Sequence, residues 1–207
     1  MAALLCVVLA FLAGSIPFGV LIGRTFFQID PRAHGSGNIG AANALRTLGK
    51  GGAAAVLVLD ALKGGAAAAL GIAVGGTALG AACGFAAIAG HCFSPWLGWR
   101  GGKGVATSLG VVFALSWPAG LAFVIVWSTF VGAFGFSSLG SLAASIAAPF
   151  ALWFMIGGNG LAYGLASAAL IAFTHRTNIS RLLTGTENRL SFGRTKRAED
   201  ESSSGAT

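Results

Sequence analysis

The sequence predicts an all-α protein, a polytopic integral membrane helical bundle with seven transmembrane segments. Three observations predict it. Apolar residues make up 55% of the 207-residue chain and charged residues only 9%, whereas a soluble domain carries about 25% charge. The apolar residues fall into seven continuous runs, separated by breaks rich in glycine or charge. Lys and Arg concentrate in the loops that alternate crossings would place on one face.

The seven runs have lengths that suit helices in a bilayer, where a full crossing takes about 20 apolar residues. They cover residues 2–23, 53–75, 77–97, 104–116, 118–135, 139–157 and 159–174. No basic residue precedes the first run and Pro17 falls inside it, which favours a first membrane helix over a cleaved leader. The fourth run is short for a crossing, so a half-helix that enters part of the membrane is the alternative.

The charges orient the bundle. Seven crossings put residues 24–52, 98–103 and 175–207 on one side, and twelve of the thirteen Lys and Arg lie there. The exception is Lys63, inside the second run. By the positive-inside rule that side is cytoplasmic, so we expect the N-terminus outside and the C-terminus in the cytoplasm. Residues 1–194 are predicted to form one membrane domain, and residues 195–207 a short, polar, disordered cytoplasmic tail.

Composition also narrows the function. The net charge of +7 suits anionic lipid and anionic substrates, while nucleic-acid binding lacks the basic stripe interleaved with aromatic residues that it needs. Cys6, Cys83 and Cys92 lie in apolar runs and read as buried small hydrophobes. Within residues 1–194 the acidic residues Asp30, Asp60 and Glu187 form no cluster for Mg²⁺ or Ca²⁺, and the HExxH, Walker A and GxSxG motifs do not occur, so we predict neither a metal nor a cofactor.

The first cytoplasmic stretch with unusual polarity is residues 34–46. Its glycines free the backbone to turn N–H groups toward an anion. Ser36 and Asn38 can donate to phosphate oxygens, and Arg46 can bind two oxygens at once. The simpler alternative is a Gly-rich loop capped by asparagine, with Arg46 anchored to lipid headgroups.

The second stretch, residues 90–107, contains His91 and the run Gly101-Gly102-Lys103-Gly104 just before an apolar helix. Free N–H groups, the positive end of a helix dipole and a lysine together make an anion site. The alternative is that the basic residues only mark the cytoplasmic end of a membrane segment, as the positive-inside rule describes, with Trp96 and Trp99 as interfacial anchors.

The third stretch, residues 174–187, follows the last apolar run. If it is helical, His175, Asn178 and either Arg181 or Leu182 share one face at i, i+3 spacing, and that face could meet an acyl or phosphoryl group at the membrane surface. A structural histidine is the alternative.

Two further groups of polar residues lie within or between the apolar runs. Asp60 and Lys63 are one helical turn apart at membrane depth, where ionisable groups are paired or functional. Lys63 either pairs with Asp60 or adds charge to a phosphate pocket. Ser138 and Ser141 lie near the cytoplasmic face, either as phosphate contacts or as ordinary capping and packing residues.

In this order, the stretches resemble the bacterial acyl-phosphate:glycerol-3-phosphate acyltransferase family (PlsY-type). The resemblance covers about residues 14 to 190. The matching strings are Gly14 to Gly19, Gly35 to Ala41 with Asn43 and Arg46, Asp60 to Gly64, Gly90-His91, Gly101 to Thr107, and His175 to Ile179 with Arg181, Leu182, Gly185 and Glu187.

The resemblance implies an enzyme of the bacterial inner membrane whose active site faces the cytoplasm. It would transfer a fatty acyl group from acyl phosphate, not from acyl-CoA or acyl-carrier protein, to the 1-hydroxyl of sn-glycerol 3-phosphate. The products would be lysophosphatidic acid and phosphate, the first acylation of phospholipid synthesis. The expected partners are glycerol 3-phosphate, long-chain acyl phosphate, membrane lipid and an upstream enzyme that forms acyl phosphate.

The expected site consists of two principal sets of residues and one supporting set. The catalytic set is His175, Asn178 and Ser36. The phosphate-binding set is Arg46, Lys103, Ser36, Asn38, Ser141, Gly102 and Gly104. The supporting set, of secondary importance, is Asn43, Lys63, His91, Arg181 and Glu187.

An acyl phosphate is already activated, so positioning and charge neutralisation could do most of the catalysis. Arg46, Lys103 and Ser36 would hold phosphates, while His175 and Asn178 would orient the hydroxyl or stabilise the oxyanion. The base would be either His175 or an oxygen of the departing phosphate. The rival hypotheses are an organophosphate transporter and a membrane scaffold without catalytic activity.

Overall fold

The structure, a computed structural model, describes residues 1–190; the predicted tail at residues 195–207 lies outside them. Every regular element in residues 1–190 is helical, which confirms the predicted all-α class. The longer helices are α1 (Ala2–Gly14), α2 (Phe18–Phe27), α4 (Gly49–Cys92), α5 (Val105–Leu115), α6 (Trp117–Phe134), α7 (Ser137–Ile156) and α8 (Gly158–Thr174). Short elements are η1 (Pro31–Ala33), α3 (Ala41–Thr47), η2 (Pro95–Leu97) and α9 (Arg176–Leu183).

The first predicted segment, residues 2–23, is divided into two helices. α1 ends at Gly14 and α2 begins at Phe18. Pro17 carries no N–H and disfavours helical geometry in the residue before it, so the break falls at residues 15–17 and leaves backbone groups for other partners. The Ser94 hydroxyl donates to the Ser15 carbonyl at 2.7 Å, which ties this break to the loop after α4.

The second and third predicted segments are the two arms of α4. They meet at Gly75 and Gly76, whose φ/ψ angles are not helical. Gly76 has a φ of +74°, which glycine adopts at no steric cost. The second arm ends at Cys92 rather than at residue 97, because Pro95 starts the separate turn η2.

The fourth segment forms α5, a helix of 11 residues, which is about 16 Å long and therefore as short for a crossing as the sequence indicates. α5 packs between α4 and α6. Breaks at Gly135 and Gly157, both with positive φ, separate α6, α7 and α8 as the sequence predicts.

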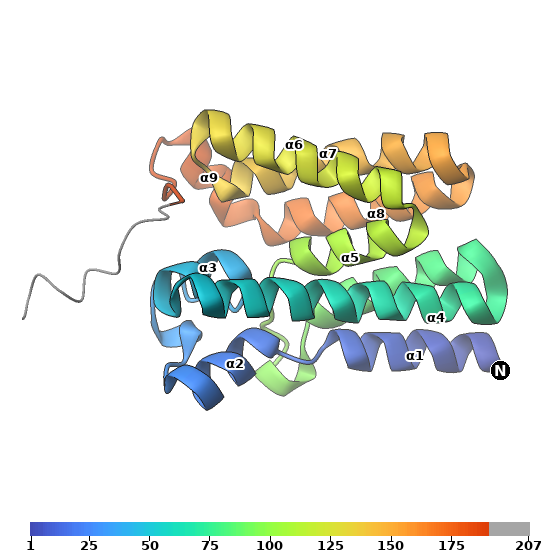
Figure 1. The fold of residues 1–207 in the computed structure, drawn as a ribbon, viewed down its shortest axis with the longest axis horizontal. Coiled ribbons are helices and arrows are strands. Elements are labelled where there is room, and N and C mark those ends of the chain that lie inside the picture. Colours follow the sequence, from blue (N-terminus) through green and yellow to red (C-terminus); the bar gives the residue numbers. More distant parts are fainter. Residues whose placement is uncertain (191–207) are drawn as a thin grey trace, which may run out of the picture.

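The long helices run roughly side by side, with α6, α7 and α8 in one layer and α1 and α4 in another (Figure 1). The short helices α3 and α9 gather at one end, and the N-terminus lies at the opposite end (Figure 1). By length and composition, four helical stretches within the described residues could cross a membrane: residues 2–27, 49–97, 117–134 and 137–156. Large apolar side chains such as Leu4, Leu62 and Phe154 are exposed on their outer faces, as expected of a surface that contacts lipid.

Candidate active site

A cavity of about 640 Å³ lies between the two layers. Its polar wall includes residues from all three polar stretches that the sequence marks. Its apolar wall comes from α4, α5 and α6 and includes Leu57, Leu109, Phe123 and Trp127. The volume falls in the range of small-molecule sites, and the mixture of walls suits a ligand with a charged head and an apolar chain.

The loop at residues 34–40 is built around Asn43, at the start of α3. The Asn43 amide donates to the carbonyls of Pro31, His34 and Asn38, and its oxygen accepts the Ser36 N–H at 2.8 Å. Asn43 is 1% exposed, and these bonds use its hydrogen-bonding capacity. Its role is therefore to shape the loop that carries Ser36 and Asn38 to the cavity.

The start of α5 faces the cavity, because Val105 and Ala106 line it. The first N–H groups of a helix have no partner within the helix, and they lie at the positive end of its dipole. Gly104 turns the chain into α5 with a φ of +84°, and a Cβ there would stand 2.8 Å from Ile88 Cγ2. Lys103 thus enters the cavity beside a ready anion-binding helix end.

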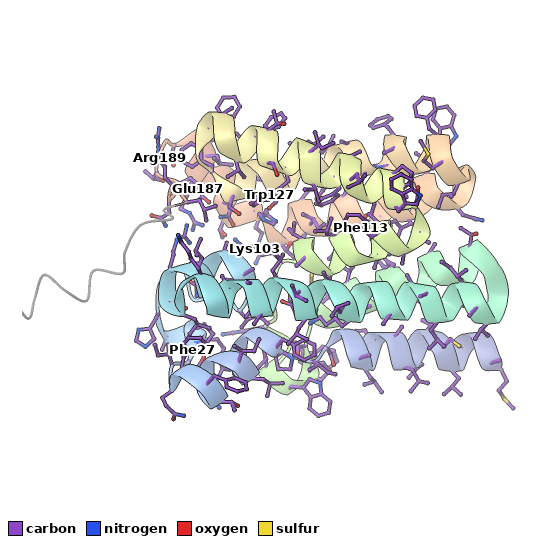
Figure 2. All side chains as sticks on the ribbon, in the orientation of Figure 1. Phe27, Lys103, Phe113, Trp127, Glu187 and Arg189 are labelled. Atoms are coloured by element: carbon purple, nitrogen blue, oxygen red, sulfur yellow. The ribbon has the colours of Figure 1, made fainter. Side chains whose placement is uncertain are left out.

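A hydrogen-bonded network joins Lys103 to Glu187. Lys103 Nζ donates to Asn178 Oδ1 at 2.5 Å, and Asn178 Nδ2 donates to Glu187 Oε1 at 2.6 Å. Glu187 also accepts from the Ser138 hydroxyl and from Arg181 Nε, both at 2.7 Å. Figure 2 shows Lys103 between the two layers and Glu187 at the same end of the molecule. Glu187 is the hub that fixes Asn178 and Arg181.

Burial sets the charge states in this network. It lowers the pKa of Lys103 to about 8, an effect that Glu187 opposes and that Arg181 and Arg46 reinforce. Burial would raise the pKa of Glu187, but hydrogen bonds from Arg181, Asn178 and Ser138 outweigh it and hold that pKa below its usual value. Near neutral pH the site contains an ammonium, a guanidinium and a carboxylate.

His175 lies between α8 and α9, buried except for 3% of its surface, and it lines the cavity. Its Nδ1 is 2.9 Å from the Ile171 carbonyl. Because that oxygen only accepts, the neutral ring carries its proton on Nδ1 and leaves the lone pair on Nε2. Burial and the neighbouring Lys103 lower the pKa of His175 to about 4, so the ring is a neutral acceptor at pH 7.

The remaining predicted phosphate ligands surround these groups. Ser36, Asn38, Arg46 and Ser141 all line the cavity. The Ser141 hydroxyl donates to the Ser137 carbonyl within α7 at 2.8 Å. The i, i+3 spacing predicts that His175, Asn178 and Arg181 share one face, and all three do line this cavity. A smaller cavity of about 230 Å³ adjoins the first and shares Ser36, Lys103 and Arg181 with it.

Two predicted residues lie behind the wall rather than on it. Gly102 and Lys63 do not contribute to the cavity lining, whereas His91 and Asp60 do. Lys63 pairs with Asp60 at 2.7 Å, which favours the pairing interpretation over direct contact with a phosphate.

Sequence reasoning did not mark the apolar wall. Leu57, Phe123 and Trp127 look like any other residue of a membrane helix, and nothing in the local pattern separates a groove from a lipid-facing surface. Lys50 also lines the cavity. Its position four residues after Arg46 was a usable signal, since it continues the basic character of that stretch.

The chain is similar to known proteins over most of its length. Residues 4–185 match the family model described as glycerol-3-phosphate acyltransferase. The chain is 46% identical over 188 residues to the glycerol-3-phosphate acyltransferase of Mesorhizobium japonicum, covering 90% of this chain and 95% of that one. It is 48% identical over 184 residues to the Brucella suis protein of the same name, covering 88% and 90%.

Two crystal structures of PlsY, described as an integral membrane glycerol 3-phosphate acyltransferase, share the fold. The glycerol 3-phosphate form superposes with a TM-score of 0.88 at 40% identity, covering 92% of this chain and 96% of that one. The lysophosphatidic acid form gives 0.86 at 38%, covering 93% and 97%. On the strength of the matching family model, these relatives and the shared fold, the chain belongs to the PlsY-type glycerol-3-phosphate acyltransferase family.

Proposed function

We propose that this protein transfers a fatty acyl group from acyl phosphate to the 1-hydroxyl of sn-glycerol 3-phosphate, releasing lysophosphatidic acid and inorganic phosphate. The observation that carries the proposal is the cavity with two kinds of wall. Four basic side chains, Arg46, Lys50, Lys103 and Arg181, line it against two acidic ones, Asp60 and Glu187. The apolar walls between α4 and α6 would hold the fatty chain.

Both proposed substrates carry a phosphate, and the site offers donors for two. Lys103 and the start of α5 form one group of donors. Arg46, from α3, with Ser36 and Asn38 forms another. Charge-assisted contacts of this kind are the strong ones, and donors fixed before the reaction stabilise charge that develops during it.

The reaction forms one ester bond and breaks one mixed-anhydride bond. The hydroxyl oxygen of glycerol 3-phosphate attacks the acyl carbon, and the bond from that carbon to the phosphate oxygen breaks. The hydroxyl proton goes to His175 Nε2 or to the departing phosphate. The low pKa of His175, about 4, makes it a weak base, so we assign it the orientation of the hydroxyl and assign the proton to the phosphate.

The membrane arrangement that fits this reaction has seven crossings, with the N-terminus outside and the cavity at the cytoplasmic face of the bacterial inner membrane. The arms of α4 supply two crossings, and α1 with α2, α5, α6, α7 and α8 supply the rest, with α5 short. Arg24, Arg46, Lys50, Lys103, Arg176 and Arg181 would then share the cytoplasmic side.

The test uses the purified full chain in lipid with palmitoyl phosphate and labelled glycerol 3-phosphate. We expect labelled lysophosphatidic acid and an equal amount of inorganic phosphate. Parallel reactions replace palmitoyl phosphate by palmitoyl-CoA or palmitoyl-acyl-carrier protein. Product from either of these, and none from palmitoyl phosphate, would overturn the donor assignment. Uptake of glycerol 3-phosphate into sealed vesicles without acylation would favour a transporter.

His175→Ala tests the assignment of the proton. A measurable residual rate, with glycerol 3-phosphate binding unchanged, is expected if phosphate takes the proton. Complete loss of turnover in a variant that still binds both substrates would make His175 the base.

A further inference from the structure

A second polar cluster lies inside the helical bundle, where two of its members reach the cavity wall and the third, Lys63, lies behind it. It consists of Asp60 and Lys63 on the first arm of α4 and His91 at the end of the second arm. All three are buried, at 1%, 8% and 4% exposure. The acyl transfer described above assigns them no step, so their retention at membrane depth needs another explanation.

Lys63 is held by acceptors on several sides. Its Nζ is 2.7 Å from Asp60 Oδ1 and 2.8 Å from the Ile16 carbonyl, which lies at the break between α1 and α2. The third neighbour is His91 Nδ1 at 3.0 Å. Of the three donors of an ammonium, two are used in hydrogen bonds to Ile16 and His91, and the Asp60 carboxylate neutralises the charge as an ion pair.

This geometry fixes the state of His91. Since Lys63 donates to Nδ1, that nitrogen must present its lone pair, and the proton of the neutral ring lies on Nε2. Asp60 Oδ1, 3.5 Å from Nδ1, faces the same side of the ring. Lys63 therefore fixes both the orientation of the imidazole and its tautomer.

The far edge of the His91 ring supports the loop that carries Lys103. A Cβ placed on Gly102 would lie 2.0 Å from His91 Nε2, so only a glycine backbone leaves room for the ring. Gly102 N–H donates to the His91 carbonyl and Gly101 N–H to the Cys92 carbonyl, both at 3.0 Å. The next residue, Lys103, reaches the cavity and Asn178.

We propose that His91 is a positioning residue for phosphate binding: Asp60 and Lys63 lock its ring, and the ring edge sets the Gly101–Gly104 loop so that Lys103 and the start of α5 face the anion. The proposal rests on the acyl transfer proposed above. Glycerol 3-phosphate is held by headgroup contacts alone, whereas acyl phosphate is also held by its chain. Misplacement of Lys103 therefore weakens glycerol 3-phosphate binding first.

The test compares two substitutions, each of which keeps a polar group at the position of one of the two ring nitrogens of His91. His91→Asn keeps an acceptor where Nδ1 lies, so Lys63 stays satisfied, but it removes the edge against Gly102. His91→Gln keeps an amide near Nε2 and loses the acceptor for Lys63. With palmitoyl phosphate saturating, we expect His91→Asn to raise KM for glycerol 3-phosphate about tenfold, with kcat within about threefold of the unmodified chain.

His91→Gln should restore KM to within about threefold of the unmodified chain while lowering the melting temperature. Glycerol 3-phosphate binding without donor, measured by calorimetry, should follow the KM values. Unchanged KM and binding in His91→Asn would overturn the proposal, as would a fall in kcat and melting temperature with no shift in KM. If the unmodified chain does not acylate glycerol 3-phosphate, the proposed function fails, and the calorimetric comparison still tests His91.

Should both variants fail to fold, the unmodified chain gives the answer. The ¹⁵N spectrum of labelled histidine in lipid bilayers should show His91 with a protonated Nε2 and an unprotonated Nδ1, in contact with the Lys63 ammonium. A proton on Nδ1 would overturn the proposal.

Discussion

The molecule contains two lysine clusters that differ in how fully each ammonium is used. The Lys63 ammonium has two hydrogen-bond partners, His91 and the Ile16 carbonyl, and forms an ion pair with Asp60. Among residues 1–190, the Lys103 ammonium has one hydrogen-bond partner, Asn178, and faces the cavity. An ammonium has three donors, so Lys103 keeps two for a ligand, whereas Lys63 lies behind the cavity wall among groups of the protein. From this difference we propose that Lys103 binds substrate and that Lys63 holds the scaffold.

The largest effect on stability should come from a substitution in the buried cluster of Asp60, Lys63 and His91. Lys63→Met removes the cation and leaves Asp60 buried without a countercharge, which costs about 3–5 kcal/mol in comparable pairs. We expect the free energy of unfolding, measured by denaturant titration in micelles, to fall by that amount. The double variant Asp60→Leu with Lys63→Met should recover most of the loss, because no charge is then stranded.

Tyr163→Phe is the matched control for this experiment, since it removes one buried polar atom that bonds Ser108 away from the cavity wall. A Lys63→Met variant no less stable than Tyr163→Phe would show that the buried pair contributes little.

Substitutions in the cluster around Lys103, which faces the cavity, should affect turnover rather than stability. Lys103→Ala removes a fixed positive donor from the site, and loss of one such donor lowers kcat by about 10² to 10³. The melting temperature should change little, because Lys103 has one partner to lose. Lys103→Arg should recover part of the rate, since it keeps the charge but not the geometry. A rate in Lys103→Ala within a few-fold of the unmodified chain would remove Lys103 from the site.

A smaller effect should follow from Glu187→Gln. The amide oxygen still accepts from Asn178, but the amide N–H groups then face the N–H group of Arg181 Nε. Both are donors, so the hydrogen bond with Arg181 is lost. Loss of a hydrogen bond to a charged group is worth about 1.5–3 kcal/mol, so kcat/KM should fall about 10- to 100-fold. Arg189→Gln, in the same segment but exposed and stacked on Phe136, is the control and should retain activity. Equal effects of the two changes would remove Glu187 from its role as hub.

The smallest effect is a pH dependence. The pKa of Lys103 is about 8, so its ammonium is present below that pH and is lost as pH rises through it. Between pH 7 and pH 9 we expect kcat/KM to fall about tenfold. In Lys103→Arg this fall should move to higher pH, because guanidinium stays charged. An identical alkaline limb in the two proteins would assign the fall to another group.

The sequence by itself determined the class of fold, the breaks and the chemistry of the loops. Charge is scarce in the apolar runs, and the breaks near Gly76, Gly135 and Gly157 follow from local steric and solvation rules, whereas the break at Pro17 inside the first predicted run was not expected. Motif order was enough to indicate the family, and the three polar stretches marked many of the polar residues that line the cavity. The number of membrane crossings and their orientation stay predictions.

Tertiary structure alone decided which of these residues contact each other. Asn178 and Glu187 are close in the sequence, so a contact between them is local. Asn178 also bonds Lys103, 75 positions away, and Glu187 bonds Ser138, 49 positions away. The same is true of Lys63 with His91, 28 positions apart, and of the apolar wall formed by Leu57 and Trp127. Local patterns fix which side chains a helix carries, whereas packing between helices fixes which side chains meet, and hydrogen bonds depend on distances that only packing sets.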